Sequence, residues 1–158
     1  MKKGIVSILS FTIGGIIGSG IVGDRLGKDL IKKQEMSDKH LALFLMMNQW
    51  VRIHQEGKKL SSYFEKNGYR KIAIYGMSHA GRTLLGELKE SDVQVMYTID
   101  KNPDNAVDGV DAYSVEDDLE DVDAIIVTAI AYFEEIREEL EEKIKCPIIS
   151  LESVIYEI

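Results

Sequence analysis

The segment that decides the fold is IAIYGMSHAG, residues 72–81. An apolar run ends at Gly76, and a helical pattern with leucines on one face follows over residues 80–90. A strand that enters a glycine turn and then a helix is typical of folds that bind phosphate at the helix N-terminus. The usual form of this turn is G-x-G-x-x-G, and here Ser78 stands at the position of the middle glycine.

Each glycine of this fingerprint has its own task. The first allows the sharp turn and the last allows the helix to pack closely on the strand, and these are Gly76 and Gly81. Ser78 narrows the approach of a phosphate, although its hydroxyl can donate a hydrogen bond. His79 and Arg82 follow in the loop and first helical turn, where a guanidinium can contact phosphate. Both could equally be ordinary solvent-facing residues, but together the turn predicts a phosphate-bearing ligand.

An acidic residue after the second predicted strand strengthens this interpretation. Asp100 lies nineteen residues after Gly81, where a carboxylate accepts hydrogen bonds from ribose hydroxyls and repels a 2′-phosphate. This favours NAD over NADP, and Lys101 weakens the preference. The alternative is a simple turn acid, because residues 100–105 read DKNPDN. Thr128, at the end of the fourth predicted strand, could bond the ligand or merely its own backbone.

Strand and helix patterns alternate from residue 67 onward. The alternation predicts an α/β fold, a minimal Rossmann-like parallel sheet of about five strands with right-handed crossovers and the order 3-2-1-4-5. We assign this nucleotide-binding domain to residues 67–158. The expected strands are 71–76, 93–100, 110–114, 122–130 and 147–151, and the expected helices are 80–90 and 131–144.

The N-terminus predicts a membrane anchor. Residues 4–23 carry no charge over a length that can cross a bilayer core, and small residues recur there at intervals of four. We expect a transmembrane helix within residues 1–23; a signal peptide or a tail that spans nothing are the alternatives. Lysine and arginine are more frequent after the segment than before it, which places the soluble domain in the cytoplasm at the cell membrane, as a single-pass protein.

Residues 24–66 form a basic helical lead-in. Ser37 can cap a helix that Gly57 ends, and a shorter helix over 59–66 is stopped by Asn67 and Gly68. The longer helix is apolar most of the way round, so it must be buried against the domain or against another copy of the chain. A homo-oligomer is therefore expected as one possibility. The main apolar face of the longer helix is expected to be Leu43, Met46, Met47, Trp50, Val51 and His54. Leu41, Phe44 and Leu45 extend this face.

Composition excludes several classes of partner. Residues 72–158 hold 21 Asp and Glu against 6 Lys and Arg, which argues against a nucleic-acid partner for the domain. The single cysteine, Cys146, permits no internal disulfide, and the three histidines show no metal-ligand spacing, so no metal is expected. The sequence offers no Tyr-x-x-x-Lys dyad, Ser/His/Asp arrangement or second domain for a substrate. It therefore predicts a domain that binds and is poorly equipped to catalyse.

These residues also resemble a family. The stretches 71–104, 118–130 and 146–158 are similar to the small Rossmann domains of bacterial surface-polysaccharide gene clusters, and the lead-in 38–69 is similar to that of stand-alone members. Such domains open nucleotide-sugar acyltransferases, precede membrane-bound nucleotide-sugar dehydratases, or stand alone in capsule loci. The resemblance implies a nucleotide ligand, NAD(P) or a nucleotide-sugar, bound at the positions of Gly76, Ser78, Gly81 and Asp100. It also implies a partner among polysaccharide-assembly enzymes.

Three functions are compatible with the sequence. The first is a membrane-anchored nucleotide-binding module that serves surface polysaccharide biosynthesis as an accessory or regulatory subunit. The second is a nucleotide-sugar epimerase or reductase whose remaining catalytic residues come from another chain. The third is a structural adaptor whose crevice stays empty.

Overall fold

The computed structural model describes the backbone of residues 3–101 and 109–158, and the side chains of residues 27–101 and 109–158. The chain divides into two compact units, Met1–Ala42 and Leu43–Ile158. The predicted membrane anchor lies outside the residues whose side chains are described. Within the described part of the chain, no helix combines the length and apolar character needed to cross a membrane.

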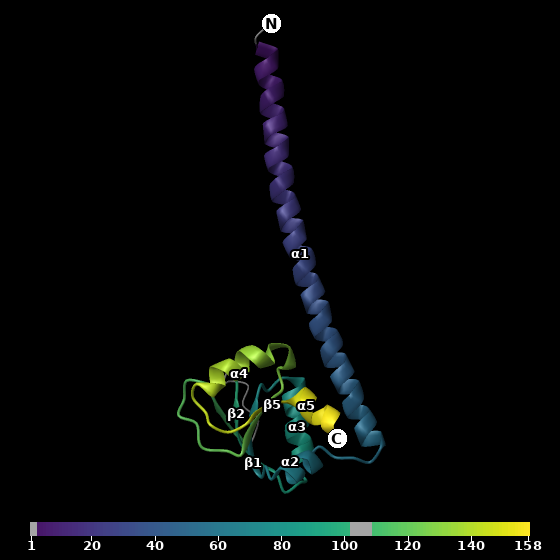
Figure 1. The fold of residues 1–158 in the computed structure, drawn as a ribbon, viewed down its shortest axis with the longest axis vertical. Coiled ribbons are helices and arrows are strands. Elements are labelled where there is room, and N and C mark those ends of the chain that lie inside the picture. Colours follow the sequence, from purple (N-terminus) through teal and green to yellow (C-terminus); the bar gives the residue numbers. More distant parts are fainter. Residues whose placement is uncertain (1–2, 102–108) are drawn as a thin grey trace. The chain divides into compact units, whose positions relative to one another are not determined.

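A five-stranded parallel sheet forms the centre of the second unit (Figure 1). The strands are β1 (Lys71–Tyr75), β2 (Gln94–Ile99), β3 (Asp111–Tyr113), β4 (Ala124–Val127) and β5 (Ile148–Ser150). Their order is β3-β2-β1-β4-β5, and each neighbouring pair is parallel. The predicted α/β class, strand number and strand order are confirmed. The order was predictable because right-handed crossovers leave few other arrangements for this pattern.

Helices cover both faces of the sheet. Helix α4 lies on one face, while α2, α3 and α5 lie on the other together with the end of α1 (Figure 1). The helices are α1 (Lys3–Gln55), α2 (Ser61–Asn67), α3 (His79–Leu88), α4 (Phe133–Glu141) and α5 (Leu151–Glu157), with a 3₁₀ turn, η2 (Ile130–Tyr132), before α4. This double cover explains why the strands read as continuous apolar runs.

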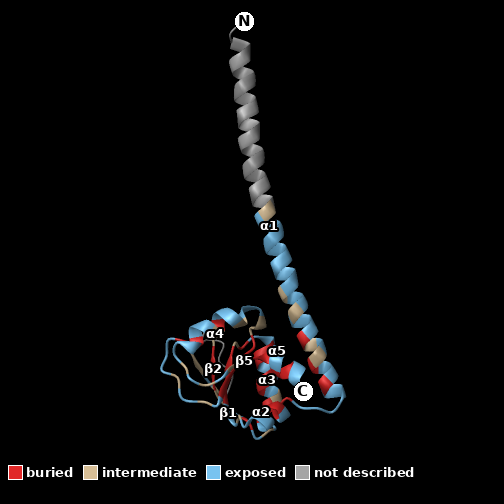
Figure 2. Cartoon of the chain, viewed as in Figure 1, coloured by how far each residue is buried: buried red, intermediate tan, exposed pale blue. Residues whose placement is uncertain are grey.

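The alternation of side chains along β1 assigns each residue to a face. Ile72 and Ile74 belong to the cluster beneath α3, whereas Ala73 and Tyr75 belong to the cluster beneath α4. All four are buried, as is every residue of β4, and Figure 2 draws buried residues in red. Tyr75, the last residue of β1, therefore lies on the α4 face beside the glycine turn.

One sequence prediction about the lead-in is wrong. Ser37 does not begin a helix, because α1 continues through it from Lys3 to Gln55, and no proline or glycine interrupts the chain near that point. The predicted burial of the helix against the domain holds for one side only. Met46, Trp50 and Ile53 are buried, while the large apolar residues on its remaining surface are exposed: Leu43, Phe44, Leu45 and Val51. The termination of α2 at Gly68 is confirmed, with φ +75° at that glycine.

The last helix, α5, was not expected from the sequence. The predicted fifth strand extends through Leu151, but the strand ends at Ser150 and Leu151 begins α5. Ser150 occupies the N-cap position, and Leu151, Val154 and Ile155 are buried at helical spacing. A serine followed by this i, i+3, i+4 pattern was the available signal.

Candidate functional site

A cavity of about 850 Å³ lies where β1, β2 and β4 end, beside the N-terminus of α3 and the start of α4. This volume is typical of small-molecule sites. The cavity is lined by Tyr75, Gly76, Met77, Ser78, His79, Arg82, Asp100, Lys101, Ala129, Tyr132 and Ile136. Of the residues predicted from the sequence, Gly76, Ser78, His79, Arg82, Asp100 and Lys101 are brought together here. Gly81 and Thr128 lie behind the lining, and Asn102, which follows Lys101, is outside the described residues.

Gly76 makes the turn that opens the cavity. Its φ of +92° is a conformation that side chains disfavour, and a Cβ there would lie 2.9 Å from the hydroxyl oxygen of Thr128. The turn is fixed from both neighbouring strands. The Gly76 amide donates to the Ile99 carbonyl at 2.8 Å, and the Thr128 hydroxyl donates to the Gly76 carbonyl at 2.6 Å. Thr128 is 3% exposed, so its hydroxyl holds the turn and does not line the cavity.

Gly81 brings α3 against that turn. A Cβ at this position would overlap the carbonyl oxygen of Gly76 and crowd the sulfur of Met77. The role proposed for the last glycine of the fingerprint, close packing of the helix on the strand, is what the geometry requires of Gly81.

The N-terminus of α3 faces the cavity through Ser78 and His79. Ser78 holds the N-cap position with extended backbone angles of φ −68° and ψ −164°, and its side chain makes no capping hydrogen bond. Both residues are exposed. The first amide groups of a helix have no partner within it, and the helix dipole adds positive potential at this end. The arrangement is suited to an anion, with the Ser78 hydroxyl as an additional donor.

Asp100 and Arg82 hold the peptide groups of Met77 between them. The Met77 amide donates to a carboxylate oxygen of Asp100 at 2.9 Å, and Arg82 donates through Nε to the Met77 carbonyl at 3.1 Å. Asp100 is half-buried, and its own amide donates to the Tyr113 carbonyl at 3.0 Å, which fixes it to β3. The acid is therefore more than a turn former, because it positions the glycine loop and lines the cavity at the same time.

Tyr75 is a site residue that the sequence reasoning missed. Its side chain is 3% exposed and lines the cavity, and its hydroxyl oxygen is buried with no hydrogen-bond partner in the part of the chain that the structure describes. Burial raises the pKa of this hydroxyl, and the carboxylates of Glu139 and Asp100 raise it further. The group therefore stays protonated at neutral pH. A buried polar group without a partner is uncommon in folded proteins and calls for an explanation.

Met77, Tyr132 and Ile136 were also missed. Ile136 is identifiable as an inward-facing helical residue, but its position at the mouth of a cavity depends on where α4 begins. Together with Tyr75 and Ala129, the side chains of Tyr132 and Ile136 give the β4 side of the cavity an apolar and aromatic lining. The β2 side, with Asp100 and Lys101, is charged.

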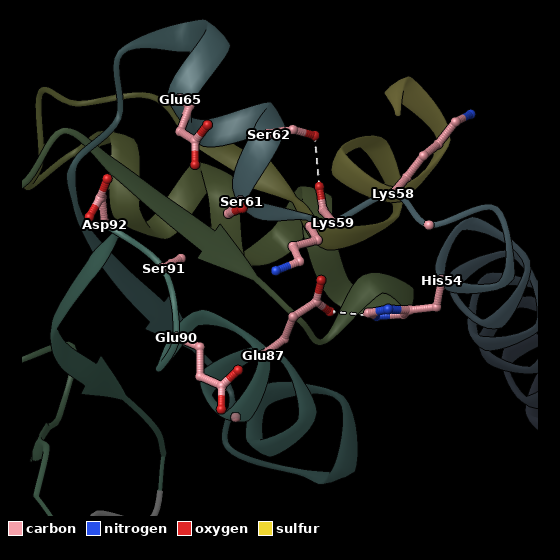
Figure 3. Close-up of a pocket in the computed structure, with 12 residues that line it drawn as sticks. His54, Lys58, Lys59, Ser61, Ser62, Glu65, Glu87, Glu90, Ser91 and Asp92 are labelled. Atoms are coloured by element: carbon pink, nitrogen blue, oxygen red, sulfur yellow. Dashed lines mark hydrogen bonds and ion pairs between the residues drawn. The ribbon is translucent and has the colours of Figure 1, made fainter.

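A second cavity, of about 890 Å³, lies between the end of α1, α2 and the C-terminal half of α3 (Figure 3). Its central carboxylate, Glu87, accepts hydrogen bonds from the Trp50 indole at 2.7 Å and the Leu60 amide at 2.8 Å. The Nε2 of His54 lies 3.0 Å from the same carboxylate. Because Glu87 binds groups of the protein itself, we interpret it as a structural centre that joins three segments.

Neither a metal centre nor a reactive thiol emerges from the described residues. Within residues 27–101 and 109–158, no group of three His, Cys, Asp or Glu side chains is placed to hold a metal ion. Cys146 is half-buried, and burial raises the pKa of its thiol, with Asp121 and Asp123 adding to the effect. A thiol in such surroundings is less reactive than a free cysteine.

Comparison with known proteins gives one match. No curated protein matches the chain, and no solved structure matches it. A family model described as C2185-like, N-terminal, matches residues 68–148. The match begins just before β1 and ends at the start of β5, so it includes the glycine turn, Asp100 and the strand of Thr128. Because it spans just over half of the sequence, the chain belongs to the C2185-like N-terminal family.

Proposed function

We propose that the second unit is a Rossmann-like module that binds a nucleotide, NAD(P) or a nucleotide-sugar. The supporting observation is the cavity itself, which collects the glycine turn, the N-terminus of α3 and Asp100 at the carboxyl ends of β1, β2 and β4. In open parallel sheets, ligands bind outside the carboxyl ends of the strands, where the strand order reverses. Here that point lies between β1 and β4.

The proposed contacts follow from the chemistry of the lining. Phosphate oxygens accept hydrogen bonds from the amides at the start of α3 and from the Ser78 hydroxyl, and Arg82 adds positive charge. Ribose hydroxyls donate to Asp100, beside the turn. A binding role of this kind needs no group beyond those that already line the cavity.

The cellular setting of the proposal comes from the sequence and the resemblance alone. We propose an accessory or regulatory subunit of surface polysaccharide biosynthesis, attached to the cell membrane through residues 1–23 with its α/β unit in the cytoplasm. Its partners would be polysaccharide-assembly enzymes or a second copy of the chain. The uncharged N-terminal segment and the lysines and arginines that follow it support this placement.

Ser78→Asp is expected to weaken ligand binding strongly without weakening the fold. Aspartate is as good an N-cap as serine and favours the helix dipole, so the ligand-free protein should keep its melting temperature. A carboxylate at this point repels phosphate, and we expect at least a tenfold loss of affinity. The measurement is thermal stability of the full chain with NAD, NADP, ADP and UDP-glucose; a ligand at 100 times its Kd stabilises the wild type by about 2.7 kcal/mol.

Thr83→Asp is the matched control for Ser78→Asp. Thr83 lies in the same helix, is exposed and does not line the cavity, so this variant adds the same charge without reaching the ligand. Its ligand-dependent stabilisation should equal that of the wild type. If no nucleotide stabilises the wild type, or if both variants lose binding equally, the placement of phosphate at α3 is wrong.

Asp100→Asn is expected to reduce the preference for NAD over NADP. The asparagine oxygen can still accept the Met77 amide, so the turn is preserved, whereas alanine would remove that support along with the ribose contact. Loss of the negative charge removes the repulsion of a 2′-phosphate. We expect about a tenfold change in the ratio of the two Kd values, measured by calorimetry. An unchanged ratio would mean that the ribose lies elsewhere.

A further inference from the structure

The cavity has two sides with different chemistry, and the glycine turn separates them. On the β2 side lie Asp100 and Lys101, and on the β4 side lie Ala129, Tyr132 and Ile136. Since β1 lies between β2 and β4, phosphates bound at its turn would sit in the middle. On the proposed function, a nucleoside on the β2 side therefore leaves the β4 side for whatever the distal phosphate carries.

Tyr75 provides a buried polar group on the β4 side. It is the last residue of β1, its side chain lies on the α4 face with Ile136, and it directly precedes Gly76. Its hydroxyl is buried and has no partner among the described residues. Because its pKa is raised, the hydroxyl remains both a donor and an acceptor near neutral pH.

We propose that the Tyr75 hydroxyl hydrogen-bonds a sugar ring carried on the distal phosphate of a nucleoside diphosphate, and that it selects such ligands over the nucleoside diphosphate alone. This inference rests on the proposed function and deepens it. Dinucleotides and nucleotide-sugars share this chemistry, since both attach a hydroxyl-bearing ring to the second phosphate. A simple nucleotide would leave the buried Tyr75 hydroxyl without a partner.

Tyr97 provides a matched comparison. It is a second buried tyrosine beneath α4, 2% exposed, but its hydroxyl donates to the Glu120 carbonyl at 2.7 Å. Tyr97→Phe removes a hydrogen bond that exists in the ligand-free protein, whereas Tyr75→Phe removes a group without one. The ligand-free Tyr75→Phe variant should therefore melt at the wild-type temperature or above it, and Tyr97→Phe should melt below it.

The test compares ligand pairs that differ only in the distal sugar, by calorimetry on the full chain: ADP against ADP-ribose, with NAD alongside, and UDP against UDP-glucose. We expect the sugar-bearing member of at least one pair to bind more tightly to the wild type. Tyr75→Phe should lower that affinity about three- to tenfold, the equivalent of one hydrogen bond, and leave the affinity for ADP or UDP unchanged. The pair that responds identifies a dinucleotide or a nucleotide-sugar as the ligand.

The two proposals fail in different ways. If none of these nucleotides binds, both are wrong. If ADP or UDP binds but the distal sugar adds nothing, nucleotide binding stands and the role of Tyr75 is refuted. It is also refuted if Tyr75→Phe weakens both members of a pair equally, or if it lowers the ligand-free melting temperature as Tyr97→Phe does.

Discussion

Gly81→Ala should lower the free energy of unfolding by at least about 3 kcal/mol, although it adds a single methyl group. That methyl would overlap the carbonyl oxygen of Gly76, which is backbone and cannot rotate away. The turn itself cannot retreat easily, because the Ile99 carbonyl and the Thr128 hydroxyl hold Gly76 on both sides. Helix α3 must therefore move off the strand, at the cost of the packing of its buried leucines.

Gly86→Ala is the matched control and should raise the free energy of unfolding, the opposite of the effect at Gly81. Gly86 lies in the same helix, and a Cβ there would meet no atom within 4 Å. Replacing a glycine within a helix by alanine stabilises by about 0.5–1 kcal/mol. Denaturant unfolding of both variants measures the difference. Equal effects at the two positions would refute the close contact between Gly81 and the turn, whereas a large difference would support it.

The Gly81 result also bears on the ligand site. If the variant folds at low temperature, its affinity for any nucleotide should fall as well, because the amides at the start of α3 move with the helix. Ser78→Asp, by contrast, should affect affinity alone. The two variants thus separate the support of the turn from its proposed contact with phosphate.

The β1–turn–α3 segment was predictable because its signals are local. The roles of Gly76 in the turn and of Gly81 in close helix packing follow from the spacing of the two glycines alone. Asp100 follows at the interval that places it beside the turn. The strand order followed from the rule of right-handed crossovers. The local sequence pattern therefore predicts the position of the polar half of the cavity.

The apolar half could not be obtained in the same way. A strand buried on both faces is apolar throughout, so its sequence does not say which face Tyr75 occupies. The sequence places Thr128 at the end of the fourth strand as a group that bonds the ligand or its own backbone, and only the distance of its hydroxyl from the Gly76 carbonyl identifies it as a support of the turn. Ser37 was misinterpreted because a serine acts as a cap only where the preceding residues are not helical.

Glu87 illustrates the same limit and leads to the second large effect. In the sequence it is one of several acids near the end of a predicted helix, yet its side chain is 12% exposed and its carboxylate binds the Trp50 indole and the Leu60 amide. It also contacts His54 (Figure 3). These partners precede it by 27 to 37 residues. No local pattern contains that information.

Glu87→Ala should lower the free energy of unfolding by about 3 kcal/mol, because it leaves the Trp50 indole and the Leu60 amide as partly buried donors without their acceptor. Trp50 is the only tryptophan of the chain and is 2% exposed, so its fluorescence reports the change directly. We expect a red-shifted emission under native conditions and faster amide exchange over the end of α1. Glu90→Ala, an exposed acid two residues beyond α3, should change stability by less than about 0.5 kcal/mol.

The outcome decides whether the lead-in is part of the folded module. Helix α3 has the glycine turn at its N-terminus and Glu87 near its C-terminus, so one helix contributes both to the cavity beside the turn and to the attachment of the end of α1. If Glu87→Ala and Glu90→Ala are equally stable, the end of α1 is an appendage, and the Glu87 contacts contribute nothing. If only Glu87→Ala loses stability while its affinity for nucleotide persists, attachment of the end of α1 and the proposed ligand binding depend on opposite ends of α3 and can be separated.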